Sequence, residues 1–341
     1  MPRLSVVMKR KRTYLCVLAL ALLLAMLAAC SGSASEPGEY HLEDSLPQLE
    51  AAQLAPGVQL KVVATTSIVF DIALQVGGDH IDLSLLIPKG TDPHAFEPSP
   101  KDVVLMAQAD LVLINGAGLE RSLEQYLELD DVMDHVVPVS TGIDLISLDA
   151  GEADEHQDSD DHGDLDKDPH TWMDPNNVIQ WVGNMVQAFS LRDPEHSGDY
   201  QHNGSAAIEK LQELDQWIEE QVSNITEDRR KMITDHRMFS YLTQRYGLEQ
   251  SGSLSPGLTT LAQPSAKDRA QVQQVVETEG VPVIFVGNTI NPRTAEQLAS
   301  DLGIKVVTLY TGSLSDGEPA GTYHDYMRYN VSSIVSALSE E

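Results

Sequence analysis

Short apolar runs rich in β-branched residues alternate with helical segments along most of this chain, and the alternation occurs twice. Such a pattern is typical of parallel sheets that carry helices on their faces. The sequence therefore predicts an α/β fold of two lobes, each with a mostly parallel sheet. We expect first-half strands at 61–66, 81–87, 111–116 and 136–139, and helices at 67–76, 101–109 and 177–189. We expect second-half strands at 231–234, 281–286 and 305–309, and helices at 238–246, 267–279, 294–302 and 323–338.

A long amphipathic stretch separates the two halves. Apolar side chains such as Leu211, Leu214 and Ile218 recur there at the spacing of one helix face. A helix of about 25 residues spans roughly 37 Å, which is long enough to run from one lobe to the other. We therefore expect a ligand site in the cleft between the lobes. The predicted boundaries are 59–197 for the first lobe, 198–226 for the linking helix and 227–341 for the second lobe.

The N-terminus has the features of a bacterial lipoprotein leader. A basic segment precedes an apolar run from Tyr14 to Ala29, which ends in small residues before Cys30. The run is short for a transmembrane anchor, which is the alternative, and its small-residue end favours cleavage. We predict a signal peptide at 1–29 and a tether at 30–58 that carries lipid on Cys30. The folded part then lies outside the cytoplasm, anchored to the cell membrane by lipid.

Cysteine content and charge exclude several other classes. Cys16 leaves with the leader, so the mature chain has no second cysteine for a disulfide or a thiolate metal site. The formal net charge of the whole chain is −30, and loss of the basic leader makes it more negative. Nucleic acid is therefore excluded as a partner, because phosphate contacts require a basic face. The acidic surface suits solubility and equally suits the attraction of cations.

One internal segment interrupts the strand–helix pattern. Residues 151–168 are almost entirely acidic or polar and include His156 and His162. A segment with so few apolar residues cannot form a packed element. We interpret it as a loop of the first lobe, in which the two histidines serve as an auxiliary metal-capture site. A hydrated linker is the alternative interpretation.

Three histidines in separate contexts are the candidate metal ligands. His94, His170 and His236 each lie just beyond a predicted strand or at the mouth of a loop, where α/β sheets place ligands. Three neutral imidazoles would form the protein part of a tetrahedral transition-metal site. Their spacing matches no short zinc motif, so only a fold can bring them together. The neighbouring carboxylates of Asp92, Glu97 and Asp235 either orient imidazoles or cap helices.

The mature chain, from about residue 58 to 340, resembles the metal-binding lipoproteins of bacterial ABC importers for zinc and manganese, which include the streptococcal manganese adhesins. Many ordered segments carry this resemblance, and it implies two α/β lobes bridged by a rigid helix with one metal ion in the cleft. The matching segments are 63–68, 90–102, 115–120, 168–175, 235–239, 246–248, 322–323 and 327–331.

The resemblance implies that His94 and His170 bind the metal from the first lobe and His236 from the second. The family often has an aspartate as fourth ligand, but Gly312 stands at that position here. The fourth ligand is then water, Asp316 or Glu318. A histidine in the third ligand position and a weak fourth ligand favour Zn²⁺, which accepts tetrahedral geometry, over Mn²⁺, which prefers more oxygen ligands.

The predicted function is that of an extracytoplasmic solute-binding protein, a monomer that delivers Zn²⁺ to an ABC permease and its ATPase. It is not an enzyme. A manganese-specific binding protein or adhesin of the same family is the alternative. A secreted zinc hydrolase is the alternative from another class. Such an enzyme needs a general base beside the zinc-bound water, as in the His-Glu-x-x-His motif, and this sequence has no such motif.

Overall fold

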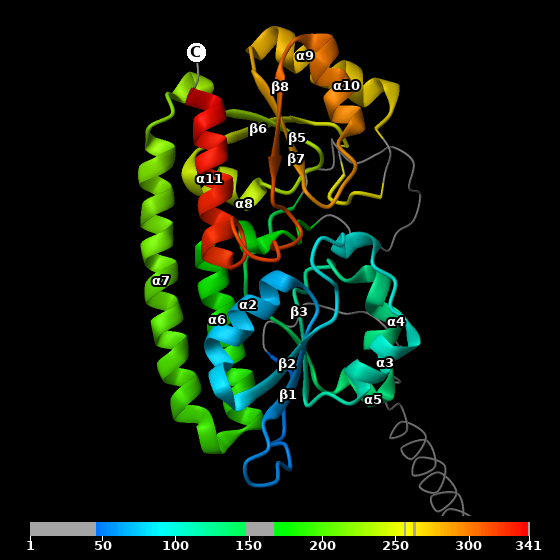
Figure 1. Ribbon diagram of the computed structural model, residues 1–341, viewed down its shortest axis with the longest axis vertical. Helices are drawn as coiled ribbons and strands as arrows, with labels where there is room; N and C mark the ends of the chain where they lie inside the picture. Colours follow the sequence, from blue (N-terminus) through cyan, green and yellow to red (C-terminus); the bar gives the residue numbers. More distant parts are fainter. Residues whose placement is uncertain (1–45, 148–166, 256, 262–263, 340–341) are drawn as a thin grey trace, which may run out of the picture. The chain divides into compact units, whose positions relative to one another are not determined.

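Eight strands in the described part of the chain form two four-stranded sheets, and each strand pairs with its neighbours in parallel (Figure 1). This computed structural model describes residues 46–147, 167–255, 257–261 and 264–339, all within one compact unit. The strand order is β2-β1-β3-β4 in the first sheet and β6-β5-β7-β8 in the second, so both lobes repeat one topology. The first-sheet strands are β1 (Leu60–Ala64), β2 (Ile81–Leu85), β3 (Leu111–Ile114) and β4 (Val136–Pro138). The second-sheet strands are β5 (Lys231–Thr234), β6 (Glu249–Ser253), β7 (Val283–Gly287) and β8 (Lys305–Leu309).

Several helices of both lobes begin at residues that suit a helix N-terminus. The Thr66 hydroxyl accepts a hydrogen bond from the Val69 amide at the start of α2, and Asp174 caps α6. First-lobe helices are α2 (Ser67–Gly77), α3 (Pro100–Ala107), α4 (Glu124–Leu127), α5 (Asp130–Met133) and α6 (Pro175–Arg192). Later helices are α7 (Ser197–Ser223), α8 (Ser240–Tyr246), α9 (Ala266–Glu279), α10 (Arg293–Leu302) and α11 (Tyr323–Ser339). Short 3-10 turns are η2 (Gly78–His80), η3 (Pro93–Ala95), η4 (Arg121–Leu123), η5 (Thr171–Met173), η6 (Pro194–His196) and η7 (Glu227–Arg229).

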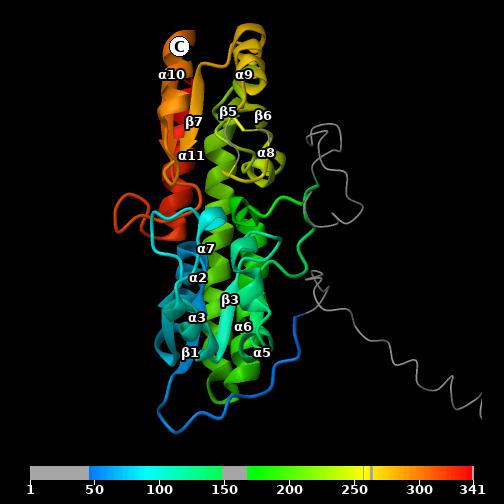
Figure 2. The same ribbon diagram turned by 90° about the vertical axis from the view of Figure 1, so that its right-hand side faces the viewer.

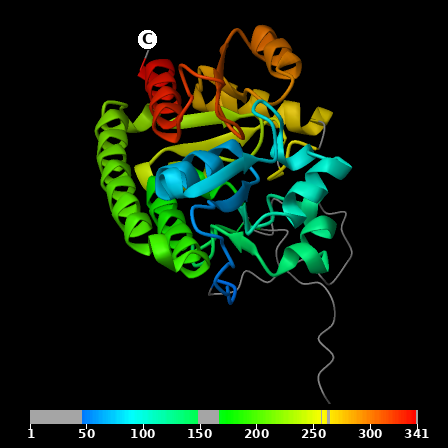
Figure 3. The same ribbon diagram turned by 60° about the horizontal axis from the view of Figure 1, so that its bottom comes forward.

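The helix α7 connects the lobes. Its 27 residues correspond to a length of about 40 Å, and Figures 1 and 2 show it running past both sheets. It packs side by side with α6 (Figure 3). A Cβ atom at Gly204 of α7 would lie 2.4 Å from Cγ2 of Val186 in α6. The glycine therefore permits the two helix backbones to approach closely.

One apolar cluster extends through both lobes. It joins Val62 in the first sheet and Ile72 of α2 to Leu211 and Ile218 of α7 and to Phe285 in the second sheet. A smaller cluster packs α9 and α10 against the second sheet around Ile284. Because the core is continuous across α7, burial of apolar surface holds the linking helix to both lobes.

The predicted fold class is confirmed, with a helix longer than any other described one between two parallel sheets. The strand β6 was not predicted, because its sequence Glu-Gln-Ser-Gly-Ser has no apolar alternation. It lies at a sheet edge, where only one side pairs with another strand. Across the described ranges, none of the helices combines the length and apolar character needed to cross a membrane. The predictions for the signal peptide, Cys30, His156 and His162 fall outside the described residues.

Candidate metal centre

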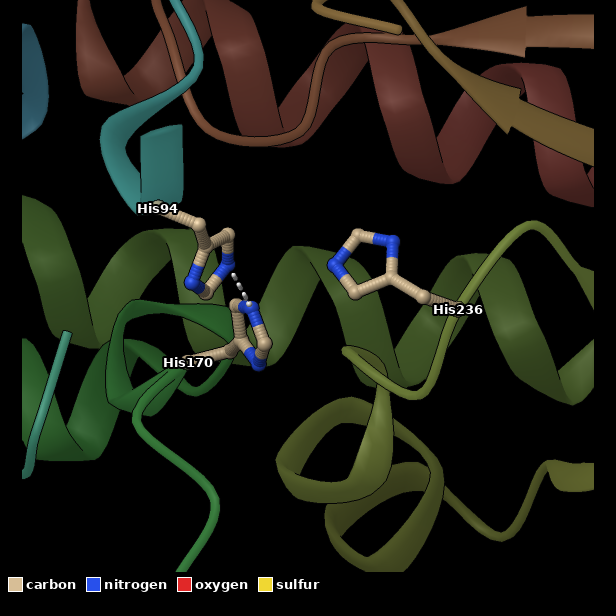
Figure 4. Close-up of side chains that lie close together, drawn as sticks. All are labelled: His94, His170 and His236. Carbon is tan, nitrogen blue, oxygen red and sulfur yellow. Dashed lines mark hydrogen bonds between the residues drawn. The ribbon is translucent and has the colours of Figure 1, made fainter. Parts of the chain in front are cut away.

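The side chains of His94, His170 and His236 converge from three separate loops (Figure 4). Each histidine offers one ring nitrogen, and these three atoms all lie within 4.8 Å of one another. All three residues are buried, with exposed fractions of 9%, 1% and 4%. Among the residues that the structure describes, this is the one group of histidine, cysteine or acidic side chains with the geometry to hold a metal ion.

His94 lies in the turn η3, beyond the carboxyl end of β2. The Asp92 carboxylate accepts a hydrogen bond from the His94 amide at 3.0 Å and so caps this turn. Its other oxygen accepts a hydrogen bond from the Thr260 hydroxyl, which belongs to the second half of the chain. Asp92 thus has the capping role that the sequence left open, while Glu97 is exposed.

His170 directly precedes η5 and is oriented by Asp168. Oδ1 of Asp168 lies 2.7 Å from Nδ1 of His170 and also accepts the His170 amide at 2.9 Å. This contact leaves Nε2 of His170 directed at the cluster, the arrangement in which a carboxylate orients a metal-ligating imidazole. Asp168 was not predicted to have this role. The sequence nevertheless contains a signal, since Asp-Pro-His occurs at both 92–94 and 168–170.

His236 follows β5, with Asp235 beside it. Asp235 accepts the His236 amide at 2.9 Å through Oδ1 and the Gly287 amide at 3.0 Å through Oδ2. Nδ1 of His236 lies 3.2 Å from Oδ1 of Asp235. Neither ring nitrogen of His236 has a hydrogen bond of good geometry among the described residues. Buried polar atoms without partners are uncommon in folded proteins, and a metal ion would satisfy one of them.

The distance between the first two imidazoles fits a shared cation. Nε2 of His94 and Nε2 of His170 are 3.1 Å apart, and Figure 4 marks this contact with a dashed line. Two nitrogens bound to one tetrahedral Zn²⁺ at about 2.0–2.1 Å would be roughly 3.3 Å apart. The ring centroid of His236 lies 5.8 Å from the ring centroid of His94 and 5.2 Å from that of His170. The three rings therefore surround one small volume.

The electrostatic environment keeps two of the imidazoles neutral. Burial lowers the pKa of His94 well below its ordinary value, and the other two histidines lower it further. Burial also lowers the pKa of His170 despite the opposing effect of Asp168. Burial lowers the pKa of His236 too, but the carboxylates of Asp235, Asp92 and Asp168 together outweigh this effect, so its pKa is raised. Neutral imidazole is the form that binds a metal.

The structure does not bring a carboxylate into the cluster as a fourth ligand. Asp316 and Glu318 are exposed, and neither belongs to the group of converging atoms. Gly312, at the position where the family often has an aspartate, packs against Pro93, the residue before His94. A Cβ atom at Gly312 would lie 2.8 Å from Cδ and 3.1 Å from Cγ of Pro93. The described residues therefore supply three nitrogens and no carboxylate oxygen to this group.

A buried acid that was not singled out in the sequence supports the first-lobe side of the site. Glu120 accepts hydrogen bonds from the Thr65 hydroxyl at 2.7 Å and from the amides of Asn115 and Gly116 at 2.7 and 3.1 Å. The Asn115 side chain in turn donates to the Pro169 carbonyl at 2.9 Å. Glu120 therefore joins the ends of β1 and β3 and, through Asn115, reaches the residue next to His170.

The family model for the periplasmic component A of zinc-uptake complexes (ZnuA) matches residues 62–337. The chain belongs to this family. The manganese-binding lipoprotein MntA of Halalkalibacterium halodurans is 30% identical over 286 residues, covering 83% of this chain and 90% of MntA. The metal ABC transporter substrate-binding lipoprotein SsaB of Streptococcus sanguinis is 31% identical over 291 residues, with the same shares covered.

Solved structures share this fold. The periplasmic zinc-binding protein TroA of Treponema pallidum superposes with a TM-score of 0.73 at 23% identity, covering 83% of this chain and all of TroA. A manganese-bound periplasmic protein of Candidatus Liberibacter asiaticus gives 0.70 at 24% identity, covering 82% of this chain and all of that protein. These likenesses confirm the fold of two parallel α/β lobes joined by a long helix. Family membership makes the chain a substrate-binding component of a metal ABC transporter and not an enzyme, as the sequence predicted.

Proposed function

We propose that this protein binds Zn²⁺ through His94, His170 and His236 and delivers it to an ABC permease driven by its ATPase. The observation that carries the proposal is the convergence of three buried imidazole nitrogens with no carboxylate among the described ligand atoms. Nitrogen ligands in a small, four-coordinate site suit Zn²⁺. Three relatives are named for zinc, manganese or metals in general, so their names do not distinguish the cargo.

Manganese is the second candidate, because MntA is described as manganese-binding. Mn²⁺ prefers oxygen ligands and higher coordination, whereas three nitrogens and water would leave it with few ligands. The Irving–Williams order also places Mn²⁺ below Zn²⁺ at a given site. We therefore assign the cargo as Zn²⁺ on ligand chemistry.

Capture and release follow from the origin of the ligands. His94 and His170 belong to the first half of the chain, and His236 follows the first strand of the second sheet. A permease that separates the lobes would withdraw His236 from the other two and weaken the site. The cargo would then be released into the permease without chemical change.

Location and loading involve residues outside the described ranges. We propose that lipid on Cys30 holds a monomeric protein at the outer face of the cell membrane. We also propose that His156 and His162 raise the local metal concentration. The described residues on either side of the acidic loop are joined by a bridge between Ser147 and Lys167, three residues before His170. Deletion of 152–167 should slow zinc acquisition under limitation, and unchanged acquisition would refute the role of this loop.

Competitive titration with Zn²⁺ and Mn²⁺, with elemental analysis of the purified protein, tests the proposal. We expect one equivalent of zinc to bind far more tightly than manganese. Tighter binding of Mn²⁺ than of Zn²⁺ would show that manganese is the cargo. Growth of a deletion strain in chelated medium, rescued by added zinc, would mark an importer, whereas an adhesin acting without transport would need no rescue.

A further inference from the structure

Hydroxyl groups from two later helices hold the backbone on either side of His170. The Tyr241 hydroxyl, in α8, donates to the Asp168 carbonyl at 2.8 Å. The Tyr323 hydroxyl, at the start of α11, donates to the Trp172 carbonyl at 2.7 Å. Asp168 and Trp172 each lie two residues from His170, so the two hydroxyls flank the candidate ligand symmetrically along the chain.

Both hydrogen bonds are buried, and in both of them the tyrosine hydroxyl is the donor. Tyr241 is 5% exposed and Tyr323 is fully buried. Burial raises the pKa of both phenols above the ordinary value, so they remain protonated and act as donors. The Tyr241 oxygen also accepts the Ile146 amide at 3.2 Å. Because Asp168 donates its amide to the Ile146 carbonyl at 2.8 Å, one hydroxyl joins two adjacent backbone segments of the first lobe.

The two tyrosines come from the part of the chain that carries the third histidine. Tyr241 is five residues after His236, on the helix that this loop leads into. Tyr323 opens α11, which packs against β8 of the second sheet and against α7. The first turn of α11 also contacts α2, where the Tyr323 amide donates to the Asp71 carboxylate at 3.0 Å. Movement of His236 away from the first lobe would carry Tyr241 with it. The carbonyl of Asp168 would then lose a buried donor, which costs free energy unless water replaces it.

We propose that Tyr241 and Tyr323 are positioning residues that tie closure of the lobes to retention of the metal on His170. Neither tyrosine is a metal ligand; each acts through a carbonyl two residues from the imidazole. The inference rests on the proposed function of the histidine cluster. It assigns to the hydroxyls a role in slow release of the cargo, because they stabilise the closed arrangement of the two lobes.

Phenylalanine variants test this role, since they remove one oxygen and keep the buried ring. Tyr246→Phe is a matched control: Tyr246 lies in the same helix as Tyr241, but its hydroxyl donates to Asp215 of α7 at 2.8 Å. Zinc release from the whole chain would be followed by stopped flow with an excess of a chromophoric chelator. We expect Tyr241→Phe and Tyr323→Phe each to speed release about tenfold, the effect of one buried hydrogen bond.

The association rate should stay within about twofold of wild type in both variants, because the closed state forms after encounter. Tyr246→Phe should leave release unchanged even if it lowers stability. Release rates of Tyr241→Phe and Tyr323→Phe equal to that of wild type, or matched by Tyr246→Phe, would overturn the inference. So would a change confined to association.

A measurement that needs no metal separates this inference from the proposed function. In the metal-free protein, hydrogen exchange at the Ile146 amide should be faster in Tyr241→Phe and unchanged in Tyr246→Phe. Unchanged exchange at Ile146 in Tyr241→Phe overturns the inference whatever the histidines bind. Faster exchange without faster zinc release also overturns it and leaves the proposed function intact. If alanine at the three histidines leaves zinc affinity at the wild-type level, the proposed function fails and the inference fails with it.

Discussion

The carboxylate of Asp168 contacts the imidazole of His170 at 2.7 Å between Oδ1 and Nδ1. The Asp92 carboxylate, in the same Asp-Pro-His sequence, instead contacts the His94 amide and the Thr260 hydroxyl. One motif therefore has two functions. In the first copy the aspartate shapes the loop, and in the second it also orients the imidazole and increases its basicity.

Asp168→Asn should weaken zinc binding about 10- to 100-fold, the usual effect of removing a carboxylate behind a metal-ligating histidine. The matched variant Asp92→Asn should have a much smaller effect, because asparagine also accepts a hydrogen bond from the backbone at a turn. Competition against a chelator of known affinity measures both. Equal losses in the two variants would show that Asp168 acts only on the loop.

His236→Ala should reduce zinc affinity by more than about 100-fold, since loss of a ligand exceeds the loss of its supporting group. The fold should remain intact, because His236 has no hydrogen bond through its ring among the described residues. Isothermal titration and thermal unfolding of the metal-free variant give the two readouts. Wild-type zinc affinity in this variant would show that His236 is not a ligand. If His236→Ala does not fold, His236→Gln is tested in its place.

Gly312→Ala should lower zinc affinity about tenfold. The added Cβ atom would overlap the Pro93 ring, which cannot rotate away, and overpacking costs about 1–3 kcal/mol. Separation of the two loops would relieve the overlap and move His94 away from its position. Gly183→Ala is the control, because a Cβ atom there meets no other atom within 4 Å and alanine favours a helix. Equal affinities of the two variants would contradict the close packing at Pro93.

Glu120 should make stability depend on pH. Burial raises its pKa from 4.5 to about 7. The folded chain therefore binds a proton on Glu120 more strongly than the unfolded chain does. Protonated Glu120 stabilises the fold fully below pH 4.5, and this stabilisation is lost as the pH rises through 7. Relative to Glu120→Gln, the wild-type chain should lose on the order of 3 kcal/mol between pH 4 and pH 8. Urea unfolding at several pH values measures this difference, and a constant difference would contradict the assignment.

The fold could be predicted to a large extent because both halves have strong patterns. Apolar runs such as 111–114 have few alternatives to a buried parallel strand, and the stripe that contains Leu211, Leu214 and Ile218 defines α7. The strand β6 could not be predicted because its residues pair through the backbone and carry no apolar signal. The strand that ends at Leu85 was expected to reach Ile87. Leu86 and Ile87 lie beyond it and donate backbone hydrogen bonds to Ala64, the last residue of β1, and to Thr65.

The sequence allowed the three candidate ligands of the site to be predicted, but not the contacts that position them. The sequence showed His94 and His236 after strands and His170 at the end of a loop, but their convergence depends on how the two sheets face each other. The same holds for Gly312, whose neighbour Pro93 lies far away in the chain. The hydroxyl of Tyr241 likewise gives no sequence signal, because a helical tyrosine is usually only a packing residue.

A crystal structure of the zinc-loaded protein, with anomalous diffraction at the zinc edge, tests the central claim most directly. We predict one strong anomalous peak bonded at about 2.0–2.1 Å to a ring nitrogen of His94, His170 and His236. An ion bound elsewhere, or three imidazoles that point away from it, would contradict the account.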